Sequence, residues 1–170
     1  MKPAAAFRVG QGFDWHRLAE GLPFRLGGVT LESPVGAQAH SDGDALLHAL
    51  TDAILGALAL GDIGDFFPPS DPQWRDADSA LFVNGAMRQA QQRGYELINV
   101  DATVFLEAPK LGPYKRAMAQ TIAQLLQIED DCVSVKAKTA EQLGPLGRCE
   151  AVAASVTVLM MTTTAAISRP

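Results

Sequence analysis

The apolar run from Ala45 to Leu60 constrains the fold of this chain more than any other segment. It reads ALLHALTDAILGALAL, and its hydrophobic residues cover most sides of a helix rather than a single stripe. A helix that is apolar nearly all round is buried in a core, so we expect this one to be buried. His48 and Asp52 are its main polar exceptions, and their spacing of four residues makes them neighbours on the helix surface.

Polar residues nearby predict where this helix begins and what contacts His48. Ser41, with Asp44 three positions later, resembles a capping box, so we predict a helix start at Ser41. Asp52, or alternatively Asp44, is predicted to hold the His48 imidazole in the tautomer that binds a metal. In a second interpretation, His48 and Asp52 are only a hydrogen-bonded polar pair in the core.

The remaining patterns predict strands interleaved with two further helices. Gly10 and Gly12 interrupt an extended segment at 7–16, which indicates a bulge or a close backbone approach. We expect a hairpin around Gly27 and Gly28. The other predicted elements are an irregular binding loop at 61–79, helices from Asp78 to about Arg93 and after Pro113, strands at 96–109, 133–139 and 150–161, and a frayed tail from Thr162.

Apolar residues are predicted on both faces of the resulting sheet. Alternate residues of the strand at 96–109 share one face, namely Ile98, Val100, Ala102, Val104 and Leu106. The other face is also apolar, judged from Phe105, Val156, Val158 and Met160. We therefore predict an α/β fold, an α+β sandwich in which a mixed sheet carries helices on one face. Its other face needs a partner, which predicts a homo-oligomer.

Length and composition predict a single domain at 1–170, with its core at about 8–160. The net charge of −5 argues against a nucleic-acid partner, and no apolar run is long enough to span a membrane. The first residues lack the apolar stretch of a secretion signal, so we expect a cytoplasmic protein. Cys132 and Cys149 are expected to be plain thiols.

All three histidines fall between residues 16 and 48. Asp14 and His16 stand two apart in a predicted strand, so their side chains project from the same face. His48 on the buried helix supplies a third ligand of suitable chemistry. One carboxylate and two imidazoles suit Zn²⁺ and leave a fourth position open, which is typical of a catalytic zinc site.

Seven motifs along the chain form a specific pattern: GFDWH, AHSDGDALLHALTDAILGALALGDIGDFFPPSDP, DADS, INVD, EAPKLGPY, VKAKTAEQLG and GR. From Arg8 to about Leu159 the chain resembles the 2-C-methyl-D-erythritol 2,4-cyclodiphosphate synthases of the non-mevalonate isoprenoid pathway. The resemblance implies a homotrimer, with the sheets lining the trimer axis and an active site at each subunit boundary. It also implies a phosphorus–oxygen lyase.

The resemblance implies two metal ions and two residues that act in catalysis. Zn²⁺ corresponds to Asp14, His16 and His48, in agreement with the trio above, and Glu141 corresponds to a ligand of a second ion, Mg²⁺ or Mn²⁺. His40 matches a residue that stabilises the transition state, and Thr139 one that contacts the diphosphate. The implied substrate-binding positions are Asp14, His16, His40, Ser41, Asp62, Ile63, Gly64, Phe67, Ser70, Asp71, Leu106, Ala108, Pro109, Lys110, Leu111, Gly112, Lys138, Thr139, Glu141 and Arg148.

Four residues depart from the family pattern, namely Trp15, Pro69, Lys138 and Pro145. Three of them, Pro69, Lys138 and Pro145, bear on the finer substrate contacts, and Trp15 bears on a ligand in an axial cavity. The implied substrate is a small molecule, 4-diphosphocytidyl-2-C-methyl-D-erythritol 2-phosphate. Its 2-phosphate attacks its own β-phosphorus and releases CMP, which accounts for the lack of a Ser-His-Asp or Cys-His arrangement.

Two other functions fit the same residues. A zinc phosphohydrolase would use the three ligands to activate water. A trimeric binding module without enzymatic activity would use the histidines only to stabilise the fold. Analysis of the reaction products separates the first from a cyclase, and the behaviour of a His16→Ala variant separates the second.

Overall fold

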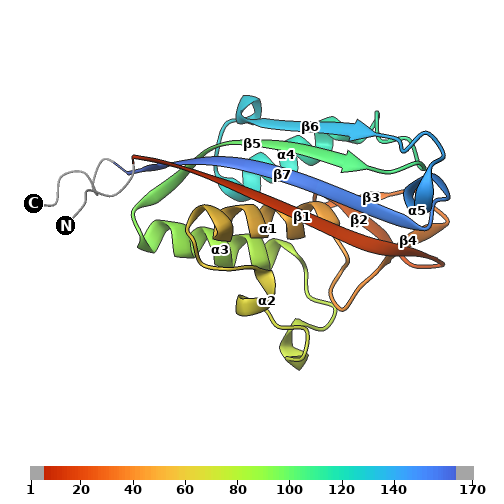
Figure 1. Ribbon diagram of the computed structural model, residues 1–170, viewed down its shortest axis with the longest axis horizontal. Coiled ribbons are helices and arrows are strands. Elements are labelled where there is room, and N and C mark those ends of the chain that lie inside the picture. The colour runs from red at the N-terminus through yellow and green to blue at the C-terminus, as the bar shows by residue number, and fades with distance from the viewer. Residues whose placement is uncertain (1–5, 164–170) are drawn as a thin grey trace, which may run out of the picture.

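A mixed five-stranded sheet carries helices on one face in the computed structural model, which describes residues 6–163 (Figure 1). The strand order is β4-β1-β7-β5-β6, and only β5 and β6 are parallel to each other. The strands are β1 (Phe7–Glu20), β4 (Val35–Gln38), β5 (Tyr95–Phe105), β6 (Val133–Lys138) and β7 (Ala151–Thr162). The main helices are α1 (Ala45–Ala57), α3 (Ala80–Gln92) and α4 (Lys115–Leu126). The predicted α/β architecture is confirmed.

Short elements complete the fold. A hairpin of β2 (Phe24–Leu26) and β3 (Val29–Leu31) turns at Gly27 and Gly28, as predicted, and both glycines have positive φ. The loop at 61–79 is not wholly irregular, because it contains α2 (Ile63–Phe66) and a 3-10 turn, η1 (Pro72–Trp74). A second 3-10 turn, η2 (Asp130–Cys132), precedes β6, and α5 (Gly144–Gly147) precedes β7. The predictions did not include β4.

Helix α1 packs directly on the backbone of β1. A Cβ atom at Gly10 would lie 1.8 Å from the Ala53 carbonyl oxygen, and one at Gly12 would lie 2.0 Å from the Ala49 carbonyl oxygen. Real Cβ atoms do not approach other atoms so closely, so only glycine fits at either position. Of the two predicted meanings of these glycines, the close approach is the correct one. It brings the inward side of β1 into contact with a helix in which every residue except Asp52 and Gly56 is buried.

The predicted start of α1 at Ser41 is wrong. The N-cap is Asp44, whose carboxylate accepts a hydrogen bond from the Leu47 amide at 3.0 Å. The same carboxylate accepts the amides of Gly27 and Gly28 at 2.8 and 2.7 Å, so it also anchors the hairpin turn. Burial raises the pKa of Asp44 despite these three donors. Because both carboxylate oxygens of Asp44 accept these backbone amides, Asp44 is not the group that orients His48.

The two faces of the sheet differ from the prediction in their residues but not in their character. Val156, Val158 and Met160 were expected on the face away from the helices, yet all three belong to the core beneath α1. The outer face of β7 is instead formed by the alternate set of residues, which includes Ala153. Trp15, Ala153 and Phe105 form one row across β1, β7 and β5 on that face. Phe7, Val9, Phe13 and Trp15 are each about half exposed or more there, with exposures of 49–67%.

A bulge in β5 explains a second difference. The register of β5 on β7 shifts between Leu97 and Asn99, so Ile98 is left out of the inward set and Leu97 is buried in its place. Val100, Ala102 and Val104 point into the core as predicted, and Leu106 is buried just beyond the strand. One extra residue in a strand exchanges the inward-facing and outward-facing sets of residues on one side of the bulge.

Two predictions concern the ends of the chain and its relation to membranes. Thr162, placed in the frayed tail, is instead the last residue of β7 and is buried, while residues 164–170 lie outside the described part. Within residues 6–163, every helix is too short or too polar to cross a membrane.

Candidate metal centre and substrate pockets

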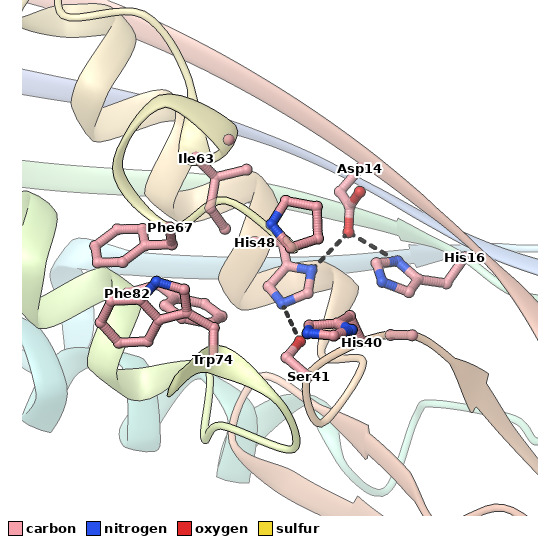
Figure 2. Close-up of a pocket in the computed structure, with 12 residues that line it drawn as sticks. Asp14, His16, His40, Ser41, His48, Ile63, Phe67, Trp74 and Phe82 are labelled. Carbon is pink, nitrogen blue, oxygen red and sulfur yellow. Dashed lines mark hydrogen bonds and ion pairs between the residues drawn. The ribbon is translucent and has the colours of Figure 1, made fainter. Parts of the chain in front are cut away.

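Asp14, His16 and His48 converge at one point between β1 and α1 (Figure 2). Asp14 and His16 lie on the inward side of β1, two and four residues beyond Gly12, where the strand is in contact with the helix. The Asp14 Oδ2 atom is 2.8 Å from His16 Nδ1 and 3.1 Å from His48 Nδ1. One ligand atom from each of the three residues lies within 4.8 Å of the other two. The predicted trio therefore exists and can hold a metal ion.

The nitrogen of His16 supports this assignment. Its Nδ1 atom is buried and, among residues 6–163, has no hydrogen-bond partner of acceptable geometry, although Asp14 Oδ2 is only 2.8 Å away. A carboxylate oxygen and an imidazole nitrogen are both metal-ligand atoms, so a cation bound beside them would satisfy the His16 nitrogen. The residues present thus fit a metal ion.

The charge of Asp14 is secured by its surroundings. Burial by itself raises the pKa of Asp14, but the contacts with the imidazoles of His16 and His48 lower it further than burial raises it. The net pKa lies well below the usual range of an aspartate. Asp14 is therefore an anionic ligand across the range of pH in which proteins normally work.

The predicted partner of His48 is wrong. Asp52 lies one turn further along α1, but its Oδ1 atom accepts the Ile63 amide at 2.7 Å and so fixes the start of α2. Burial raises the pKa of Asp52 and outweighs this hydrogen bond. The second nitrogen of His48, Nε2, instead faces two hydroxyl groups, Ser79 Oγ at 2.8 Å and Ser41 Oγ at 3.1 Å.

A cavity of about 250 Å³ opens onto the metal-binding trio. His40 and Ser41 line it beside the trio, and Ile63, Gly64 and Phe67 line it from the α2 segment, as predicted. An aromatic wall closes the side opposite Asp14 (Figure 2). In this wall the ring of Phe67 lies 4.8 Å from Phe82 and 5.1 Å from Trp74. The cavity therefore joins a polar, metal-binding end to an apolar one.

Three residues predicted on this side do not line the cavity. Asp62 is exposed, and its carboxylate caps α2 by accepting the Gly64 amide at 2.9 Å. Asp71 similarly accepts the Gln73 amide at the start of η1, and Ser70 is exposed. Pro69, one of the residues that depart from the family pattern, lines the cavity instead. The structure thus gives Asp62 and Asp71 local roles in holding the loop.

A separate pocket of about 220 Å³ contains most of the other predicted residues. It lies where β5 and β6 end, next to the start of α4. Its lining includes Leu106, Lys110, Leu111, Gly112, Lys138 and Thr139 from the predicted set. Ala108 and Pro109 belong to the same loop but do not line the pocket. The two pockets share no lining residue, so a single chain does not bring the two predicted groups together.

Glu141 and Arg148 lie outside both pockets. The Thr139 hydroxyl donates a hydrogen bond to Glu141 Oε1 at 2.6 Å, which links Glu141 to the edge of the second pocket. Arg148 is exposed and forms a two-pronged pair with Glu150 at 2.8 and 3.0 Å. The mutual attraction raises the pKa of Arg148 and lowers that of Glu150.

Three site residues were missed. Trp74 and Phe82 form the aromatic wall, and Ser79 contacts His48. Phe82 belongs to the apolar side of a helix, and nothing in its spacing distinguishes a core residue from one that lines a cavity. For Ser79 the only signal was its place in the motif DADS, which said nothing of the contact it makes.

The fold and the site define a class of protein: an α/β chain with an Asp-His-His metal-binding cluster between its sheet and its central helix. Residues 7–161 match the YgbB family, and the chain belongs to that family. It is similar to 2-C-methyl-D-erythritol 2,4-cyclodiphosphate synthase of Koribacter versatilis, at 54% identity over 136 residues that cover 80% of this chain and 88% of the relative.

Two solved structures are similar throughout the chain. The bifunctional IspDF from Campylobacter jejuni matches with a TM-score of 0.88 and 42% identity over 92% of this chain, which spans 42% of that longer protein. The CDP complex of IspF from Plasmodium falciparum matches with a TM-score of 0.82 and 33% identity, covering 94% of this chain and 98% of the other.

Proposed function

We propose that this protein converts 4-diphosphocytidyl-2-C-methyl-D-erythritol 2-phosphate to 2-C-methyl-D-erythritol 2,4-cyclodiphosphate and CMP. The reaction belongs to the non-mevalonate route to isoprenoid precursors and makes the enzyme a phosphorus–oxygen lyase. The observation that carries the proposal is the metal-binding cluster of Asp14, His16 and His48 at the end of a cavity. The chain that holds it is 54% identical, over 136 residues, to a 2-C-methyl-D-erythritol 2,4-cyclodiphosphate synthase.

The chemistry requires positioning rather than an enzymic nucleophile. An oxygen of the substrate's 2-phosphate forms a bond to the β-phosphorus, the bond from that phosphorus to the bridging oxygen breaks, and its electron pair leaves with CMP. The protein must therefore bring two anionic groups together and offset their charge, which oriented donors and cations do. The polar end of the cavity has suitable groups for this purpose.

Zn²⁺ is the ion that this donor set fits best, because one carboxylate and two imidazoles are borderline ligands that suit zinc. Asp14, His16 and His48 would hold it. When bound, zinc supplies Lewis-acid polarisation of a phosphoryl oxygen. His40 and Ser41 line the cavity next to these ligands, where each can donate a hydrogen bond to a phosphate oxygen and so offset its charge.

The size of the pockets supports an active site built from two chains. Ligand pockets typically measure about 300–1,000 Å³, whereas the two cavities here measure about 250 and 220 Å³. A substrate that carries both a nucleotide and a phosphorylated sugar alcohol therefore needs both. We propose that the pocket of Lys110 and Lys138 in one subunit meets the metal cluster of the next in a homotrimer. The exposed apolar row on the outer sheet face is suited to the trimer axis.

Within the second pocket, the predicted roles divide between base and diphosphate. The loop at 106–112 would hold the cytosine largely through backbone groups. Lys138 and the Thr139 hydroxyl would contact the diphosphate, and Glu141, hydrogen-bonded to Thr139, would help to hold Mg²⁺ or Mn²⁺. Arg148 would act near the trimer axis. A rice relative is chloroplastic, and for this chain we propose the cytoplasm.

Product analysis tests the proposal. Purified protein is supplied with zinc and magnesium and incubated with the cytidyl substrate, and the products are separated by chromatography and ³¹P NMR. We expect equal amounts of CMP and a cyclic diphosphate. Open-chain phosphates would instead identify a zinc phosphohydrolase, and no turnover with intact zinc binding would favour a binding module.

A further inference from the structure

The nitrogen of His48 that points away from the metal-binding cluster enters a chain of hydrogen bonds. His48 Nε2 lies 2.8 Å from Ser79 Oγ, and Ser79 is fully buried. Ser79 in turn contacts Asp42 twice, because its hydroxyl is hydrogen-bonded to Asp42 Oδ1 and its amide donates to Asp42 Oδ2 at 3.1 Å. The chain joins the start of α3 to the turn that precedes α1.

Counting hydrogens determines the direction of these bonds. A carboxylate only accepts, and a serine hydroxyl has one hydrogen to donate. Because Asp42 takes that hydrogen, Ser79 Oγ can only accept from His48. The opposite arrangement would place the lone pairs of Nε2 and Oγ against each other at 2.8 Å. Ser79 and Asp42 therefore favour the His48 tautomer with its hydrogen on Nε2, whereas the Asp14 carboxylate, 3.1 Å from Nδ1, favours a hydrogen on Nδ1 unless a cation lies between them.

That tautomer leaves the other nitrogen free for a metal. His48 Nδ1, which is 3.1 Å from Asp14 Oδ2, then presents its lone pair to the metal-binding cluster. We propose that Ser79 and Asp42 are positioning residues that fix the His48 tautomer and ring orientation for metal binding. The inference rests on the proposed function, because a metal ion at this cluster is what requires the free lone pair.

The position of Asp42 suits this task. Its side chain is only 10% exposed, and Arg25 Nε lies 3.7 Å from its Oδ2 atom, so a positive charge faces the carboxylate from the hairpin. Arg25 also reaches Asp78 at 3.4 Å, and Asp78 provides a nearby carboxylate that does not contact Ser79 or His48 through its side chain. Ser79 makes no side-chain cap hydrogen bond to α3, so removing its hydroxyl does not remove a helix cap.

The test measures metal affinity and tautomer as well as turnover. Zinc affinity is determined by competition with a chromophoric chelator for the wild type, Ser79→Ala, Asp42→Asn and the control Asp78→Asn. Partners that orient a metal-binding histidine are worth about 10- to 100-fold in affinity. We expect losses of this size for Ser79→Ala and Asp42→Asn and an unchanged affinity for Asp78→Asn. Ser79→Thr, which retains the hydroxyl, should recover most of the loss.

A spectroscopic measurement isolates the tautomer. The chain has three histidines, so their ring nitrogens can be resolved by ¹⁵N NMR of the metal-free protein at mildly alkaline pH. In the wild type we expect part of the His48 population to carry its hydrogen on Nε2, in competition with the Asp14 carboxylate at Nδ1. The hydrogen should shift toward Nδ1 in Asp42→Asn, because the Asn side chain offers only one acceptor and the Ser79 hydroxyl can then donate to Nε2.

The possible outcomes separate the two proposals. If the wild type binds zinc, and neither Ser79→Ala nor Asp42→Asn changes the His48 tautomer or the zinc affinity, the positioning role is overturned and the proposed function stands. Wild type that binds no zinc would overturn both. A folded Ser79→Ala with weaker zinc binding and an altered Co²⁺ absorption spectrum would support the inference, because a purely structural role would leave the ligand field unchanged.

Discussion

The two sides of β1 differ in the residues that they carry and in what packs against them. On the inward side, Gly10 and Gly12 allow α1 to touch the strand backbone, and Asp14 and His16 follow where the helix still lies close. On the outward side, alternate residues such as Phe13 are large, apolar and half exposed. One strand therefore contributes to a buried site and to an uncovered face, because successive side chains point in opposite directions.

This difference teaches where the strand tolerates change. The inward side is fixed by a backbone-to-backbone contact in which an added methyl group has no space. On the outward side, the residues that can be accommodated depend only on what covers this face in the assembled protein. Variants on the inward side should therefore lose stability and metal, whereas variants on the outward side should lose assembly.

The largest effect is expected for Gly12→Val. Its Cβ would lie 2.0 Å from the Ala49 carbonyl oxygen, so β1 must move away from α1 and the ligands must separate. We expect a loss of at least about 3 kcal/mol in the free energy of unfolding and loss of metal, measured by urea denaturation and metal analysis. Gly56→Ala is the control, because its nearest atom is 3.8 Å away. It should gain up to about 1 kcal/mol. Equal stability of Gly12→Val and the wild type would contradict the contact.

Removing a ligand should stop turnover without unfolding the chain. We expect His16→Ala to lose bound zinc and to slow CMP release by at least about 10³-fold, because a Lewis acid is worth several kcal/mol in the transition state. His40→Ala, which changes a residue of the same cavity, should keep its zinc and still lose turnover. Metal analysis and a CMP assay measure both. A fully active His16→Ala would exclude the trio as the metal centre.

The outward side should affect assembly first. Phe13→Lys buries a charge if this face lies in a trimer, so we expect association to weaken at least about 100-fold, measured by sedimentation. The separated chain should retain its zinc, because all three ligands come from one subunit, yet lose turnover because the second pocket is missing. Phe13→Leu is the matched control. A Phe13→Lys protein of unchanged mass would remove the outer face from the interface.

The smallest effect is expected at Asp52 in the metal-free protein. Burial raises the pKa of Asp52 in the folded state above its unfolded value, so ionisation lowers stability as the pH rises through that interval. Asp52→Asn avoids this cost and keeps an acceptor for Ile63. It should be more stable than wild type by up to about 0.5 kcal/mol at neutral pH, after allowance for screening, with a smaller difference in acid. Asp52→Ala should lose about 1 kcal/mol. Thermal unfolding against pH measures both variants.

The sequence predicted the elements of the fold well where a residue type has one structural use. The glycines of β1, the Gly27–Gly28 turn and the buried helix were all identified correctly. β4 was missed because VGAQ is short and carries little strand signal. The faces of β7 were reversed because alternation divides a strand into two sets without saying which one meets the helices.

The candidate site was predicted less completely, for a related reason. The trio of ligands could be identified because rare residue types stood at strand and helix spacing. The partners of His48 could not be identified in the same way, because spacing made Asp52 its neighbour whereas the fold directs that carboxylate to Ile63. Ser79 is 31 residues away in the chain, and only the packing of α3 against α1 brings it to the imidazole. Likewise, spacing alone does not predict which residues of a second subunit would complete the pocket.

The first and last strands of the chain, β1 and β7, are neighbours in the sheet. Asp14, His16 and His48 leave the ribosome long before β7, although β7 pairs with β1 from Phe7 to Arg17, the stretch that carries two of the ligands. During synthesis Asp14 and His16 therefore lie on a segment whose main pairing strand has not yet been made. The sheet that carries Asp14 and His16 is therefore complete only after β7 has been inserted between β1 and β5.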